Sequence, residues 1–311
     1  LDIGLFSRVN VSLDWYTRTT KDLLMSKQLN SISGFSSLLT NVGQMRNTGV
    51  ELEVRSNNIK TKDFSWTTAF NLSHNKNKIL KLADLPWFVD GRYVRKEGYP
   101  FNTIYLREYA GVDPETGSAL YYDNQQDENG NYTKNKVTDP GQASPIPLKD
   151  ITPTISGGFM NTFNYKFIDL SFNLSYSFGG YSYDNASYIL QDDGYSVISN
   201  KSTEQRRRWQ KPGDITDVPR FVYGNKKGGN YNSSRAIHST DHIRLKSLIL
   251  GLNAPKAWLQ KLGIGNARIY FSGTNLLTWA AYDQYDPEMS GVVGFYTPPL
   301  KTYAFGLELK F

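Results

Sequence analysis

An uninterrupted alternation of apolar and polar side chains between Phe167 and Gly180 is the feature of this sequence that most limits its possible folds. A period of two residues predicts a β-strand with one apolar and one polar face. The run is about eleven residues long, which a tilted strand needs to cross a bilayer. A half-buried strand of a water-soluble sheet has the same pattern, so this run alone leaves both readings open. The apolar face would carry Ile168, Leu170, Phe172, Leu174, Tyr176 and Phe178, and the polar face Asp169, Ser171, Asn173, Ser175 and Ser177.

Similar alternation recurs along the chain and predicts about eight strands in total. The connections between them alternate between long and short, which is the layout of an outer-membrane barrel with extracellular loops and periplasmic turns. A Greek-key sandwich gives no reason for every long loop to lie at one end. We also expect a short strand at 119–123 and a helical turn at 256–262. The long connections are expected at 17–47, 76–153, 179–240 and 277–300, and the clearest short ones at 57–63 and 253–266.

The composition agrees with a barrel and excludes several other classes. The mean hydropathy is −0.50, and no window approaches 18 consecutive apolar residues, so the sequence predicts no transmembrane helix. A barrel is not excluded by this test, because half of each strand is polar. The absence of Cys excludes disulfides and thiolate metal sites. The formal charge of +6 is expected on a solvated surface, although it could also favour anionic lipid headgroups. The chain begins at Leu1 without a signal peptide, so we expect a part of a longer protein.

The last residues show alternation up to the final position. Their apolar members resemble the C-terminal recognition signal of outer-membrane barrel proteins, and we expect them to act as an assembly signal. About eight strands from a wide barrel would leave long edges whose backbone groups lipid cannot satisfy. We therefore do not expect residues 1–311 to insert stably alone. The expected signal comprises Tyr303, Phe305, Leu307, Leu309 and Phe311.

An ordered set of motifs over nearly the whole chain resembles the SusC/RagA family of TonB-dependent transporters. No single motif is specific, but their order and approximate spacing are those of the family. They are Asn41-Val42-Gly43, Asn47 to Glu53, Ser156 to Asn161, Asp169-Leu170-Ser171, Phe178-Gly179-Gly180, Arg208-Trp209, Lys211 to Asp214, Ile243 to Lys246, Leu250-Gly251, Thr274-Asn275-Leu276 and Tyr285 to Glu288.

The resemblance implies an all-β fold, in which residues 1–311 are the C-terminal part of a transmembrane antiparallel barrel of about 22 strands. The family's plug domain, early strands and TonB box have no counterpart in this sequence. The family takes up glycan or peptide oligomers through the outer membrane of Gram-negative bacteria, driven by the TonB complex through a segment absent here. A SusD-like surface lipoprotein covers the loops. On this reading the protein is not an enzyme and needs no cofactor.

Aromatic and basic residues of the expected long loops are the candidate contacts for substrate or partner. Flat rings with polar tips suit sugar faces and protein surfaces, but they also suit packing inside a loop. At strand ends, Trp15, Tyr16, Tyr176 and Trp279 also suit a girdle at the membrane interface. The candidate contacts are Trp87, Tyr93, Tyr121, Arg208, Trp209, Tyr223, Tyr282 and Tyr285.

Other chemistries have weaker support in the sequence. His238 and His242 are four residues apart without the Glu of H-E-x-x-H, and residues so spaced along a strand are about 13 Å apart. The segment 123–130 differs from a calcium loop and reads as a turn, as does Asp286-Pro287-Glu288. The run Arg206 to Trp209 fits a surface loop better than a nucleic-acid site.

Two alternative functions remain open at this stage. One is a secreted or surface β-sandwich that binds carbohydrate. The other is a small closed barrel, an enzyme or an adhesin, made of these strands alone.

Overall fold

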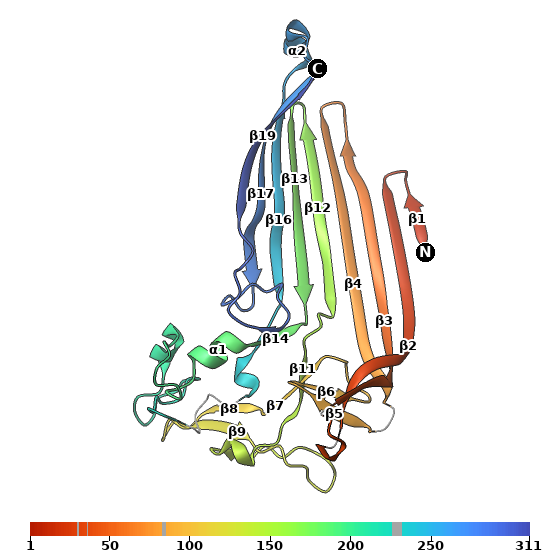
Figure 1. Ribbon diagram of the computed structural model, residues 1–311. Coiled ribbons are helices and arrows are strands. Elements are labelled where there is room, and N and C mark those ends of the chain that lie inside the picture. Colours follow the sequence, from red (N-terminus) through yellow and green to blue (C-terminus); the bar gives the residue numbers. More distant parts are fainter. Residues whose placement is uncertain (30, 36, 83–84, 226–231) are drawn as a thin grey trace.

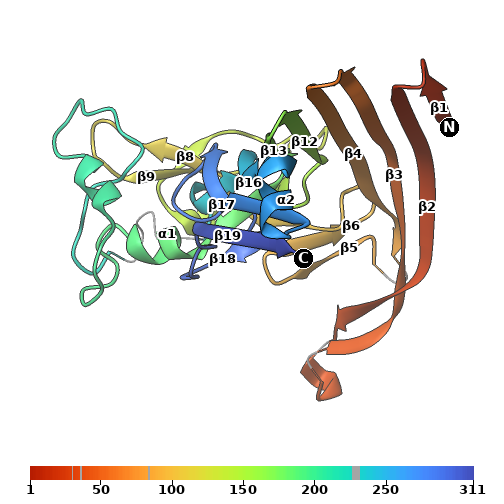
Figure 2. The ribbon, with the colours of Figure 1, turned by 90° about the horizontal axis from the view of Figure 1, so that it is seen from above.

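The computed structural model describes residues 1–311 except 30, 36, 83–84 and 226–231. Within the described part, the main element is a nine-stranded antiparallel sheet in the order β1-β2-β3-β4-β12-β13-β16-β17-β19 (Figure 1). Seen from above, its strands follow an arc, as expected for part of a barrel wall (Figure 2). The strands are β1 Asp2–Leu5, β2 Val9–Gln28, β3 Ser37–Lys60, β4 Phe64–Leu82, β12 Ile155–Tyr165, β13 Ile168–Phe178, β16 His242–Asn253, β17 Asn266–Ala280 and β19 Thr302–Lys310.

The two faces of this sheet differ in polarity, as the alternation predicts. Directly paired residues of antiparallel strands lie on the same face, so the register shows which residues share it. The apolar face includes the row Val54, Phe70, Phe159 and Leu174, and the polar face includes the adjacent row Glu53, Asn71, Gly158 and Ser175. The strand predicted between Phe167 and Gly180 is confirmed as β13, and the transmembrane barrel assignment gives its apolar face to lipid and its polar face to the lumen.

Several strands are longer than the alternation predicts. The expected connection at 17–47 is wrong for most of its length, because β2 continues to Gln28 and β3 begins at Ser37. Backbone pairing continues from Thr17 with Thr48 to Gln28 with Ser37. In this part polar residues occupy both faces, so the period of two residues disappears although the hydrogen-bonded ladder persists. The strands β3, β4 and β17 also run past the predicted loop boundaries at 57, 76 and 277.

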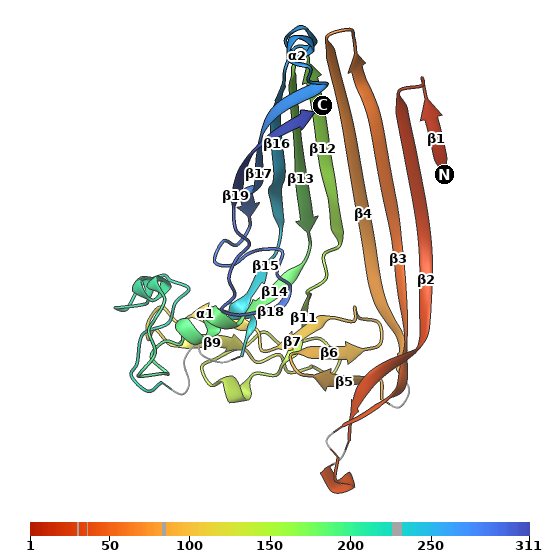
Figure 3. The same ribbon diagram turned by 45° about the horizontal axis from the view of Figure 1, so that its top comes forward.

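The long connections gather at one end of the sheet and the short turns at the other (Figures 1 and 3). The short turns lie at 61–63, 166–167 and 254–265, and the last contains the expected helical turn as α2, Lys256–Leu262. The chain's last residue lies at this turn end as well. The predicted alternation is therefore confirmed for the three long connections between β4 and β12, β13 and β16, and β17 and β19. The fourth, between β2 and β3, is much shorter than predicted.

Among the described residues, no helix combines the length and apolar character needed to cross a membrane.

The long connections fold into small sheets of their own. The strand expected at 119–123 is confirmed as β9, and three strand groups can be distinguished: β10-β9-β8, β11-β7-β6-β5 and β15-β14-β18. Their elements are β5 Trp87–Asp90, β6 Tyr93–Lys96, β7 Thr103–Leu106, β8 Tyr109–Val112, β9 Ala119–Tyr122, β10 Lys136–Val137, β11 Ile146–Asp150, β14 Tyr181–Asp184, α1 Asn185–Leu190, β15 Ile237–Ser239 and β18 Gly291–Val293, with 3-10 turns at Ser31–Ser33, Pro140–Gln142, Thr203–Arg207 and Ser234–Ala236.

Candidate binding surface at the loop end of the barrel

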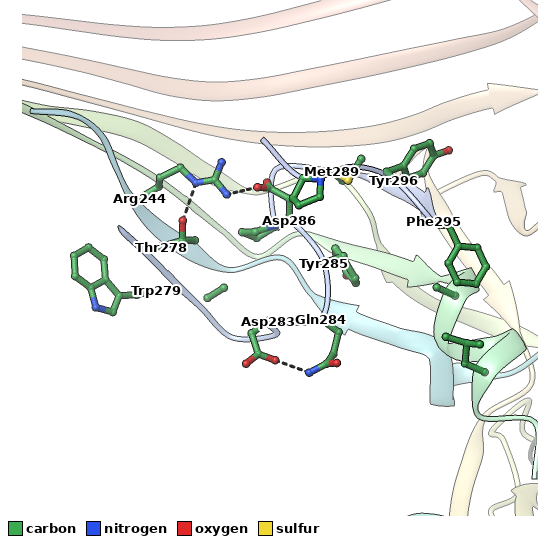
Figure 4. A pocket seen from close by; sticks show the side chains of 16 residues that line it. Arg244, Thr278, Trp279, Asp283, Gln284, Tyr285, Asp286, Met289, Phe295 and Tyr296 are labelled. Carbon is green, nitrogen blue, oxygen red and sulfur yellow. Dashed lines mark hydrogen bonds and ion pairs between the residues drawn. The ribbon is translucent and has the colours of Figure 1, made fainter. Parts of the chain in front are cut away.

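A hollow of about 780 Å³ lies where the connection between β17 and β19 meets the sheet, and we call it the mouth pocket (Figure 4). Its size is typical of pockets that hold small ligands. One wall is formed by Ala186 and Leu190 of α1, and another by Arg244 of β16 and Thr278 of β17. Trp279 and Ala280 of β17 also line it, and the rest comes from loop residues between Asp283 and Pro298.

An ion-pair network fastens this loop to the polar face of the sheet. The guanidinium of Arg244 lies 2.5 Å from a carboxylate oxygen of Asp286 and 2.9 Å from one of Glu288, and it donates to the Thr278 hydroxyl at 3.0 Å. Lys246 adds a second cation, 2.6 Å from Glu288. Arg244 is only 2% exposed. Its charge is therefore fully engaged within the protein, so it holds the loop and is not available to bind an anionic substrate.

Two predicted contacts, Tyr282 and Tyr285, pack the same loop against β14 and β15. The Tyr282 hydroxyl donates to a carboxylate oxygen of Asp184 at 2.9 Å, and its ring stacks on His238 with centroids 3.7 Å apart. Burial raises the pKa of the Tyr282 hydroxyl and lowers the pKa of the His238 imidazole, so both groups stay neutral near pH 7. Tyr285 shares a hydrogen bond with Ser182 and also lines the mouth pocket.

The accessible part of the mouth pocket is aromatic with a few polar groups. Phe295 is 69% exposed and Tyr296 is 61% exposed. Gln284 donates to the carboxylate of Asp283 at 2.8 Å, and both residues are exposed at the rim. Rings with an amide and a carboxylate can hold a neutral or cationic oligomer by stacking and hydrogen bonding. This arrangement suits reversible binding.

A second hollow, which we call the sheet pocket, has a volume of about 460 Å³ and lies on the β11-β7-β6-β5 sheet. Trp87, another predicted contact, contributes to its wall and is 45% exposed. Tyr93, in the neighbouring strand, instead packs against the buried cluster of Ile104 and Tyr183. Burial raises the pKa of Tyr93. Only Trp87 of this pair therefore offers its ring to a ligand.

Tyr121 and Trp209 hold loops together. The expectation that Tyr121 contacts a partner is wrong, because its side chain is 0% exposed and packs edge-on against Tyr109 at 5.8 Å. The alternating pattern of β9 turns it into the core of the small sheet. Trp209 donates its indole N–H to the Pro114 carbonyl at 2.8 Å, and its ring covers Gly117, where a Cβ would lie 2.4 Å from the ring.

The remaining candidates lie apart from both pockets. Arg208 is exposed, and Tyr223 is 79% exposed. The residues of the expected assembly signal lie along β19 or just after it, and their apolar side chains are all exposed. The exposed fractions are 62% for Tyr303, 81% for Phe305, 62% for Leu307, 46% for Leu309 and 88% for Phe311.

No group of three or more potential metal ligands occurs among the described residues. Asp127, in the calcium-like segment, accepts hydrogen bonds from the backbone N–H groups of Asn129 and Asn131, as in an ordinary turn. His242 contacts the Thr240 carbonyl through Nδ1 at 2.8 Å, whereas His238 is stacked on Tyr282. The two histidines thus have separate structural partners.

Known proteins with similar sequences are receptors. No protein-family model matches the sequence. TonB-dependent receptor P3 of Formosa agariphila is 33% identical over the whole chain, and TonB-dependent receptor SusC of Bacteroides thetaiotaomicron is 28% identical, again over the whole chain. The chain spans about a third of the length of these relatives, 33% and 31% respectively.

Solved structures give the same result. The RagAB peptide importer in its closed-closed state superposes with a TM-score of 0.87 at 31% identity, covering 100% of this chain and 34% of that one. A second structure of the RagAB peptide transporter gives a TM-score of 0.86 at 31% identity, covering 98% of this chain and 34% of that one. These relatives are transporters and receptors, not enzymes. The chain belongs to the SusC/RagA family of TonB-dependent outer-membrane receptors and forms part of their transmembrane β-barrel.

Proposed function

We propose that the receptor containing this chain imports nutrient oligomers, either glycans or peptides, across the outer membrane by TonB-dependent transport. The relatives named as TonB-dependent receptors and as a peptide importer support this proposal. The observation that carries it furthest is the mouth pocket, because it joins exposed aromatic rings at the loop end to the polar face of the barrel wall.

In this proposal cargo first meets the rings of Phe295 and Tyr296 and then passes along the polar face of the sheet. That face offers hydroxyl, amide and charged groups from strand to strand, which can exchange hydrogen bonds with a polar oligomer. The loop bearing Asp286 is held to the wall by Arg244, so the pocket keeps its shape without cargo. A preformed site loses less conformational entropy on binding.

The proposed partners are a SusD-like surface lipoprotein and the TonB complex. The exposed side chains of Arg208 and Tyr223 support a lipoprotein docked on the loop end, since both extend from the loop surface. Contact with TonB would use a part of the receptor outside these residues. Lipid would contact the apolar face of the sheet.

Uptake of a radiolabelled oligomer that supports growth tests this function in cells producing the whole receptor. We expect accumulation to require TonB and to fall when Phe295 and Tyr296 are both replaced by Ala. Trp258→Ala is the matched control, because Trp258 is 68% exposed but lies on α2 at the opposite end of the sheet. Accumulation that persists without TonB would refute the proposal.

A further inference from the structure

Aromatic rings occupy one side of the sheet pocket, whose lining is otherwise mostly polar. Trp87 of β5 and Tyr105 of β7 lie with ring centroids 6.0 Å apart and planes tilted by 50°. The register puts Trp87 opposite Lys96 and Tyr105 opposite Pro147, and all four residues line the hollow. Tyr132 adds a third ring from the neighbouring connection. The pocket therefore opens on the face of the small sheet.

A hydrogen-bonded hairpin forms the opposite rim and fixes its shape. Asn124 is 2% exposed with a φ of 48°, and its side-chain oxygen accepts a hydrogen bond from Lys134 at 3.0 Å. Thr133 donates to the Asp123 carboxylate at 2.8 Å. Gln125 donates to the Ser144 hydroxyl at 3.1 Å. These bonds hold the rim in place, so a ligand finds a preorganised site.

The polar groups available to a ligand are almost all neutral. Among the described residues, the side chains of Tyr105, Gln126 and Tyr132 make no hydrogen bond, and burial raises the pKa of the Tyr105 hydroxyl. The residues that line the pocket include no carboxylate, and their one cation, Lys96, lies 5.0 Å from the centre of the Tyr99 ring. The pocket thus offers rings, hydroxyls and an amide.

We propose that the sheet pocket binds a pyranose ring of an oligosaccharide, which makes saccharide the cargo class of the uptake proposed above. The apolar C–H face of such a ring can lie on Trp87 or Tyr105, and its hydroxyls can exchange hydrogen bonds with Gln126 and Tyr132. The saccharide site itself is inferred from the pocket, and only the step from bound saccharide to imported cargo rests on the proposed function.

A peptide fits this pocket less well for two reasons. Peptides that bind sheets commonly add a strand at an exposed edge, where the backbone supplies their hydrogen bonds. Here the ligand would instead meet side chains on the sheet face. In addition, the lining has no carboxylate to pair with a peptide's amino group. A saccharide requires neither feature.

Calorimetric titration of the purified whole receptor in detergent tests this site. The probes are maltohexaose, cellohexaose, xylohexaose and hexagalacturonate, with hexa-alanine as the peptide. We expect at least one saccharide to bind, and Trp87→Ala to weaken that binding about tenfold, the equivalent of about 1.4 kcal/mol. Gln126→Ala should weaken it as well. Trp258→Ala, far from the pocket, should leave it unchanged.

Three outcomes would overturn the proposal: no saccharide binds, a saccharide binds but neither Trp87→Ala nor Gln126→Ala weakens it, or hexa-alanine binds and Trp87→Ala abolishes that binding. The titration does not depend on TonB, so it tests saccharide binding separately from transport. If the receptor binds saccharide as expected but shows no TonB-dependent uptake, the proposed saccharide site stands and the proposed transport function is refuted.

Discussion

Arg244 and Asp286 form an ion pair of 2.5 Å in which both side chains are almost completely buried, with 3% and 7% of their surface exposed. Arg244 belongs to the barrel wall and Asp286 to the loop between β17 and β19. Each charge of a buried pair is stabilised by the other, because either charge left alone in a buried site is strongly unfavourable. The ion pair therefore holds the loop against the barrel wall.

Replacing Arg244 by Met should release this loop. Breaking one half of a buried pair typically costs about 3–5 kcal/mol, and here the cost can be avoided if Asp286 moves into water. We expect faster cleavage after Glu288 by a glutamyl endopeptidase acting on the purified receptor. Arg55→Met is the control, since its ion pair with Glu53 is exposed. Equal cleavage rates in the two variants would show that Arg244 does not hold the loop.

The two faces of β13 should tolerate charge differently. Phe172 lies on the apolar face and Asn173 on the polar one, where it pairs with Met160 and Ser247. Arg on a lipid-facing strand near the midplane costs about 2–4 kcal/mol. We expect Phe172→Arg to reduce the folded, heat-modifiable form of the receptor, and Asn173→Arg to assemble normally. The assignment of faces fails if both variants assemble equally.

Asn161 is a polar residue on the apolar face, and we expect it to be required there. Its side-chain oxygen accepts hydrogen bonds from the Trp66 indole and the Thr68 hydroxyl, each at 2.8 Å, and it is 2% exposed. Asn161→Leu removes this acceptor and should cost about 1–3 kcal/mol, although Leu is more apolar. In the Asn161→Leu variant the Trp66 indole N–H has lost its acceptor, and adding Trp66→Phe removes this unpaired donor.

Heat dissociation of the folded barrel in detergent measures this effect. The double variant Asn161→Leu with Trp66→Phe should unfold at a higher temperature than Asn161→Leu alone. A double variant that is no more stable than the single one would mean that the Trp66 hydrogen bond is not the source of the loss.

The sequence predicted the membrane-spanning part of the fold well. Between Ile168 and Phe178 the environment changes from lipid to lumen at every residue, so the alternation and the strand coincide. Beyond the apolar band this constraint ends. The pairing of Thr17 with Thr48 leaves no period in the sequence because both faces carry polar residues, and the extension of β2 was missed for that reason.

The binding surface was predicted less completely. The candidate contacts in the loops were selected by residue type alone. Residue type does not show that Tyr121 is buried whereas Trp87 is half-exposed. The link between Arg244 and Asp286 was also missed, since it depends on how the loop folds back. One signal was present: Arg244 is a cation on a predicted membrane strand, and charged residues in membrane-spanning segments commonly pair with one another.

Phe311 remains the centre of a proposed assembly signal. We expect Phe311→Ala to lower the amount of receptor assembled in the outer membrane, because the assembly machinery would lose an aromatic side chain of the proposed signal. Phe6→Ala is a matched control: Phe6 is 89% exposed and Phe311 88% exposed, and Phe6 lies in the turn between β1 and β2. Quantitative blotting of membrane fractions compares the two variants. Equal amounts of both in the outer membrane would show that Phe311 is not part of an assembly signal.

The long connections should form the external surface of the receptor that receives cargo. Residues 1–311 contain no Cys, so a cysteine introduced here is the only one in this part of the receptor, and the receptor without it gives the background labelling. Tyr223→Cys lies in a long connection and Trp258→Cys on α2 at the opposite end, and both native side chains are exposed. On intact cells, a membrane-impermeant maleimide should label Tyr223→Cys at once and Trp258→Cys only after the outer membrane is permeabilised. Labelling of Trp258→Cys on intact cells, with Tyr223→Cys protected, would contradict the account.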